Sequence, residues 1–132
     1  MTTIIRIFMA LFLVSCTAGV VRAEPISDTD MSYVVEHIGT MFAIKSCGAK
    51  LIDGGLKKYA ERTGVDFVKT YSAVVAAYRA MTDQPYNSEN LIPAITVAVN
   101  KWATTFVAAK EANEAHICAM ITKHLKEASL IE

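Results

Sequence analysis

Apolar side chains recur every three or four residues along most of this chain, a spacing that places them on one face of a helix. The first such stretch is predicted to begin at a cap formed by Ser27, Asp28 or Asp30 and to end or bend at Gly48. Its apolar stripe consists of Met31, Val35, Ile38 and Phe42. No convincing alternation of apolar and polar residues predicts a β-strand anywhere in the chain.

Two further helices are predicted before residue 83. The weaker one covers residues 56–62, with Asp53 as its cap and Gly64 as a left-handed stop. The clearer one follows a cap at Asp66, and we expect it at the centre of the fold because a row of alanines beside its stripe would let another helix approach closely. The stripe is Phe67, Tyr71, Val74, Tyr78 and Met81, and the alanines are Ala73, Ala76, Ala77 and Ala80.

The polar stretch DQPYNSEN at residues 83–90 predicts a loop, after which Asn90 can cap a last helical region. Pro93 is tolerable in the first turn of that region, where its missing N–H is not needed. Asn113 permits either a break or a continuous helix. The buried stripe is expected to comprise Leu91, Ile95, Ala98, Trp102, Phe106 and Ala109, then Ile117, Met120, Ile121 and Leu125. The sequence therefore predicts an all-α fold, a compact bundle of four or five helices with mostly antiparallel neighbours.

The N-terminus follows the plan of a secretory signal peptide, with Arg6 before a short apolar run and small residues up to Ala23. We expect residues 1–23 to be removed and residues 24–132 to form a single all-α domain. The alternative is a lipoprotein signal over residues 1–15, because Leu13-Val14-Ser15-Cys16 resembles a lipobox in which Cys16 is lipidated. The apolar run is too short to span a membrane, so the expected membrane contact is limited to that lipid anchor.

Cys47 and Cys118 are the two cysteines that remain once Cys16 is removed or lipidated. A cysteine pair in an exported chain predicts a disulfide. Redox-active pairs typically have C-x-x-C spacing, which these two residues lack, so a structural bridge is favoured. The bridge would join the first helix of the mature chain to the last.

Charge and motifs argue against several classes of function. Removal of Arg6 and Arg22 reduces the 13 basic side chains to 11, against 13 acidic ones, so a nucleic-acid partner is not expected. His116 and His124 do not have the i, i+4 spacing of two metal ligands on one helix, and we predict neither a metal nor a cofactor. No nucleophile motif or phosphate-binding glycine loop occurs, and cap and surface roles account for carboxylates such as Glu36. The sequence therefore predicts a protein that is not an enzyme.

Contact with another protein is the function that remains. Tyr86 lies in the polar loop, and Tyr59 with Lys57 and Lys58 forms a local basic and aromatic cluster, so these four residues are the predicted partner contacts. We expect a bacterial protein of the periplasm or the secreted space, or alternatively one anchored by lipid to the envelope. It would act as an inhibitor or immunity protein, a stress chaperone or a host-interaction factor. The alternative is a carrier of a small apolar ligand with a pocket between helices. A small hydrolase is the third and weakest hypothesis.

Overall fold

A computed structural model of the chain describes residues 25–132. The predicted signal peptide and the lipobox cysteine, Cys16, lie outside these residues. The described part consists of helices and connecting turns, which confirms the all-α prediction. None of its helices is both long and apolar enough to cross a bilayer. The elements in chain order are α2 (Asp28–Ser46), α3 (Gly55–Thr63), α4 (Phe67–Met81), the short 3-10 helix η1 (Ser88–Asn90) and α5 (Pro93–Glu127).

The helix ends agree with the predicted caps at two positions and differ at two others. Ser27 Oγ accepts a hydrogen bond from the Asp30 N–H, and Asp66 Oδ1 accepts one from the Lys69 N–H, both at 3.2 Å. The prediction for Asp53 is wrong, because α3 starts after Gly54, whose left-handed backbone makes the turn without a side-chain cap. The prediction for Asn90 is also wrong, because this residue ends η1 and two extended residues separate it from α5.

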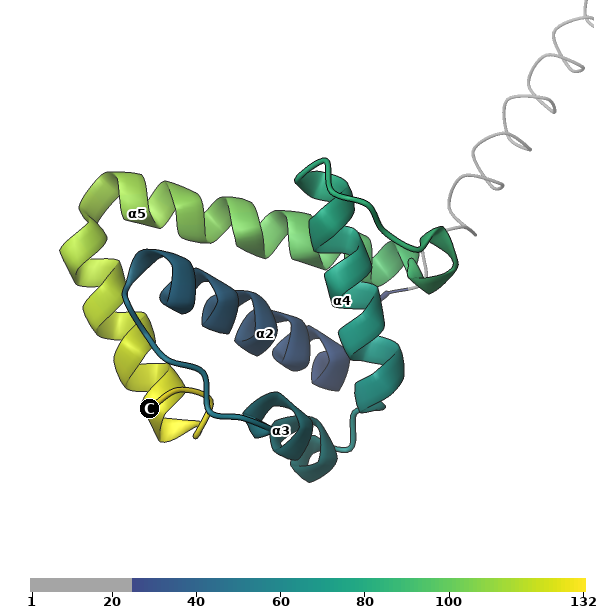
Figure 1. The fold of residues 1–132 in the computed structure, drawn as a ribbon, viewed down its shortest axis with the longest axis horizontal. Coiled ribbons are helices and arrows are strands. Elements are labelled where there is room, and N and C mark those ends of the chain that lie inside the picture. The colour runs from purple at the N-terminus through teal and green to yellow at the C-terminus, as the bar shows by residue number, and fades with distance from the viewer. Residues whose placement is uncertain (1–24) are drawn as a thin grey trace, which may run out of the picture.

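Helix α2 occupies the centre of the molecule, with α5 bent around it and α3 and α4 packed on its other sides (Figure 1). An uninterrupted run from Glu36 to Thr40 is buried, which is more than one full turn of the helix. A helix that is buried all round needs close neighbours, and Gly39 permits one. A Cβ atom there would stand 3.3 Å from Cδ1 of Ile121 on α5.

The expectation that the helix over residues 67–81 lies at the centre is therefore wrong. Its alanine row does face the core, with Ala73, Ala76 and Ala77 buried beside Val74. The larger side chains of the predicted stripe lie at the border of the core instead, and Tyr71 is 41% exposed. Small side chains allow α4 to pack closely, so its bulky residues are displaced to the edges of the contact.

The predicted disulfide between Cys47 and Cys118 is present, with a Cα–Cα distance of 5.4 Å and a sequence separation of 71 residues. It joins the C-terminal end of α2 to the second half of α5. Residues beyond α5 strengthen the same contact, because Ile131 forms an antiparallel β-bridge with Leu51 and is buried. The residues after α5 are thereby attached to the segment that follows Cys47.

Helix α5 bends sharply at Asn113, which has an extended backbone (φ −163°, ψ 91°) inside an otherwise helical stretch. The side chain of Asn113 accepts a hydrogen bond from the His116 N–H at 3.1 Å, so it caps the second half of α5. Of the two alternatives that the sequence left open, the structure has the break. Figure 1 shows the resulting elbow, with α2 lying inside it.

Replacement of Asn113 with alanine removes this cap and is expected to lower the free energy of unfolding by about 1 kcal/mol. Urea titration followed by circular dichroism measures the change. Asn100→Ala is the matched control, because Asn100 is an exposed residue inside the first half of α5, where alanine is the better helix former. Equal losses in the two variants would show that Asn113 does not act as a cap.

Candidate functional site

A groove with a volume of about 760 Å³ lies between α2, α4 and α5. Its walls are mainly apolar, and the rings of Phe42 and Phe106 stack there with centroids 5.5 Å apart. Met41, Met81 and Val107 complete the apolar surface. Its size and lining are those of sites that bind small molecules.

Charged side chains on the groove lining balance one another. Lys45 Nζ donates a hydrogen bond to the Tyr78 hydroxyl at 2.6 Å, and Lys110 Nζ contacts Ser46 Oγ at 3.5 Å. Glu111 and Glu114 lie on the same lining. Two cations and two anions leave the groove without a strong preference for charge, so its apolar walls determine what it can hold.

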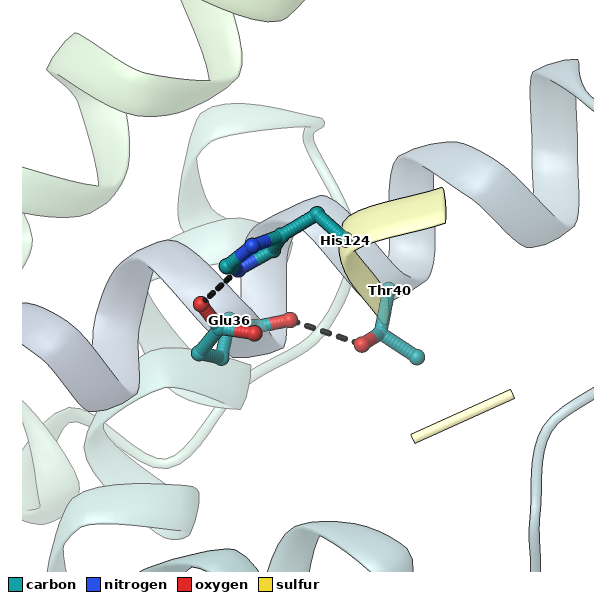
Figure 2. Close-up of polar contacts among 3 residues, drawn as sticks. All are labelled: Glu36, Thr40 and His124. Carbon is teal, nitrogen blue, oxygen red and sulfur yellow. Dashed lines mark hydrogen bonds and ion pairs between the residues drawn. The ribbon is translucent and has the colours of Figure 1, made fainter. Parts of the chain in front are cut away.

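A second polar feature joins α2 to the second half of α5, as Figure 2 shows. The imidazole Nε2 of His124 lies 2.5 Å from Oε1 of Glu36. Glu36 is only 7% exposed, whereas the His124 side chain is 60% exposed. Thr40, one turn further along α2, donates its hydroxyl to the Glu36 backbone carbonyl at 2.7 Å. A nearly buried carboxylate thus contacts a largely exposed imidazole.

A smaller cavity of about 300 Å³ opens beside this pair, on the inside of the α5 elbow. Both halves of α5 contribute to it, with Trp102 and Phe106 from the first half and Ile121 from the second. Glu36 and His124 are the polar side chains of its lining. The Glu36 oxygen that does not contact His124 is buried and has no hydrogen-bond partner among the described residues.

His37, the neighbour of Glu36, lies in an aromatic cluster on the α4 side of α2. Its ring stacks on Tyr71 at 5.1 Å and meets the edge of Tyr33 at 5.5 Å. Only 3% of His37 is exposed, and burial lowers its pKa to about 4. Burial, followed by the influence of Tyr71, raises the pKa of the Tyr33 hydroxyl. Both side chains are therefore neutral at pH 7 and belong to the core.

The predicted partner contacts do not gather at either cavity. Lys57 and Lys58 are exposed on α3, while Tyr59 packs partly against the core with Arg62 above its ring. Burial first, then the charge of Glu36, raises the pKa of Tyr59, and Arg62 opposes them. Tyr86 is 46% exposed in its loop. These four residues stay predictions, whereas Cys47 and Cys118 form the predicted bond.

The sequence did not indicate which residues come together to line each of the two cavities. Glu36 was assigned to a cap or surface role and His124 to no metal site, and a sequence separation of 88 residues hides their contact. One signal was available for Glu36. The helix around it is apolar on nearly every side, which indicates burial, and a buried carboxylate requires a partner.

Comparison with protein-family models, curated proteins and solved structures gives no significant match. Among residues 25–132, no three histidine, cysteine or acidic side chains lie close enough together to hold a metal ion. The geometry of the two cavities is therefore the basis for assigning a function.

Burial of His37 predicts a specific loss of stability in acid. The pKa of this histidine is about 4 in the folded protein and about 6.5 in the unfolded chain, so the unfolded chain binds more protons between these values. Protonation of His37 therefore leaves the free energy of unfolding unchanged above pH 6.5 and lowers it by about 3 kcal/mol as the pH drops to 4. Urea titrations at pH 7 and pH 4 on the natural protein and on His37→Phe measure it.

The phenylalanine variant keeps the ring contacts and lacks the titrating group, so the difference between the two proteins isolates His37 from the carboxylates. We expect the natural protein to lose about 3 kcal/mol more than His37→Phe. The same loss in both proteins would mean that His37 is not buried in its neutral form.

Proposed function

We propose that this protein is a non-catalytic carrier that binds a small apolar molecule in the groove between α2, α4 and α5. The groove volume of about 760 Å³ is the observation that carries the proposal, because a groove of this size with apolar walls can hold a ligand of ordinary size. Methionines on two of the helices, Met41 and Met81, suit such a role, since their flexible thioether side chains adapt to ligands of different shape.

The disulfide supports a location in an oxidising compartment, and we place the carrier in the periplasm or the secreted space. The signal peptide and the alternative lipid anchor at Cys16 belong to this proposal. An exported carrier would bind apolar compounds that dissolve poorly in the surrounding water.

Contact with another protein is the second candidate function. Its specific support is Tyr86, an aromatic side chain that is 46% exposed in a polar loop, where such residues often contribute to interfaces. Inhibitor, chaperone and host-interaction roles are all versions of this candidate. Replacement of Tyr86 with alanine would weaken such a complex and leave the groove unchanged.

Titration with N-phenyl-1-naphthylamine, an uncharged apolar dye that fluoresces in apolar surroundings, tests the carrier proposal. We expect saturable binding to the natural protein and at least about tenfold weaker binding to Val107→Glu, because the introduced carboxylate resists removal from water. Val107 lines the groove and is 52% exposed, so the substitution leaves the core intact.

Val97→Glu is the matched control, with the same substitution on the same helix at a 70% exposed residue outside the groove. It should bind the dye as the natural protein does. Absence of saturable binding to the natural protein, or equal binding to both variants, would contradict the carrier proposal.

A further inference from the structure

A third hollow, with a volume of about 160 Å³, lies between α4 and the segment that joins this helix to α5. The segment turns back along α4, and η1 packs against that helix (Figure 1). The Gln84 N–H fixes the start of the turn by donating to the Arg79 carbonyl at 2.8 Å. Among the lining residues are Tyr71, Val75 and Arg79 from α4, and Tyr86 and Asn87 from the segment.

Arg79 is the only charged side chain on the lining of this hollow. It is exposed, so a ligand can reach it, and it forms no ion pair with an acidic side chain among residues 25–132. The acidic residues of the same segment, Asp83 and Glu89, do not line the hollow. An arginine guanidinium is not deprotonated in proteins, so the positive charge does not depend on pH. The hollow therefore suits an anion.

The hydrogen-bonding groups of the hollow favour a carboxylate. A guanidinium presents its N–H groups as a rigid fork that matches the two oxygens of a carboxylate. Asn87 adds a donor, because its Oδ1 already accepts the Glu89 N–H at 3.0 Å and its amide –NH₂ group remains available. A carboxylate that enters the hollow can thus accept hydrogen bonds from both sides, from α4 and from the connecting segment.

The size and the aromatic border of the hollow favour a group that projects from a larger partner. Its volume is below the range of about 300–1,000 Å³ that is usual for small-molecule sites. Tyr71 and Tyr86 are both partly exposed beside it, and Tyr71 is held in place by its stack on His37. Arginine and tyrosine are among the residue types that contribute most to binding at protein interfaces.

We propose that this hollow is the docking site for an acidic side chain of a protein partner. The carboxylate accepts hydrogen bonds from Arg79 and Asn87, and the neighbouring residues of the partner pack on the rings of Tyr71 and Tyr86. The proposal rests on the second candidate function, contact with another protein, and assigns a chemistry to that contact. It does not depend on the groove.

Two-dimensional amide NMR spectra of the isotope-labelled protein test the proposal. The probes are an acetylated and amidated tripeptide, leucine–glutamate–leucine, its glutamine analogue, and acetate. We expect saturable shifts from the glutamate peptide in residues 71–79 and 86–90. The glutamine peptide and acetate should each bind at least about fivefold more weakly, because one lacks the charge and the other lacks the side chains that cover the tyrosines.

Three outcomes would overturn the proposal. Equal binding of the glutamate and glutamine peptides would show that the charge of Arg79 is not used. Shifts that do not saturate, or that lie outside the two segments, would show that the peptide does not bind in the hollow. Equal binding of acetate would make the hollow a site for a free small anion and not for a protein partner.

Arg79→Gln removes the charge and should weaken binding of the glutamate peptide at least about fivefold. The matched control is Arg62→Gln, since Arg62 is also an exposed arginine next to a tyrosine, with its guanidinium 5.6 Å from the centroid of the Tyr59 ring. The control should bind the peptide as the natural protein does. An equal loss in both variants would contradict a site at Arg79. Both side chains are exposed, so neither substitution alters the core.

The same experiment separates this proposal from the two candidate functions. The peptide should not displace N-phenyl-1-naphthylamine from the groove, and failure of the dye to bind leaves the hollow unaffected. If the glutamate peptide has no advantage while Tyr86→Ala still weakens a natural complex, the acidic partner is wrong and the protein contact stands.

Discussion

The covalent bond between Cys47 and Cys118 is the constraint on which the rest of the structure depends. It holds the second half of α5 against the end of α2, although the two segments are far apart in the chain. In a model based on chain entropy, closing a loop of this length stabilises the folded state by up to about 4 kcal/mol, a large part of the stability of a small domain. Two further contacts support this arrangement. Glu36 on α2 contacts His124 on α5, and Leu51, after α2, forms a β-bridge with Ile131, after α5.

The bend of α5 at Asn113 places two cavities against α2. A straight helix would pass α2 once, whereas the bent helix contacts it with both halves. The groove extends along the first half up to the bend, and the smaller cavity lies inside the elbow, with Phe106 between them. The cavities thus depend on the break in α5 at Asn113 and on the disulfide, which fixes the half of α5 beyond that break. The groove is lined mainly by the first half of α5, with Glu114 just beyond the bend, whereas the smaller cavity is lined by both halves.

Helical periodicity was sufficient to predict the fold class, and the two cysteines outside the predicted signal peptide were sufficient to predict the disulfide. Local sequence predicted the caps at Ser27 and Asp66 but not the starts of α3 and α5. It was not sufficient for α4, where five large apolar residues share a stripe but the neighbouring alanines, with Val74, form the buried face. Close packing between helices decided that outcome. Nor could the sequence pair Glu36 with His124, since their contact exists only after α5 bends. The partner contacts predicted on α3 and in the loop at Tyr86 remain predictions.

Amide hydrogen exchange, measured by mass spectrometry on the oxidised and the reduced protein, tests the central role of the disulfide most directly. The account predicts that reduction lowers protection at least about tenfold more in residues 114–132 than in residues 93–112, the first half of the same helix. Unchanged protection in residues 114–132, or an equal loss in both halves, would contradict the claim that this bond holds the second half of α5 in place.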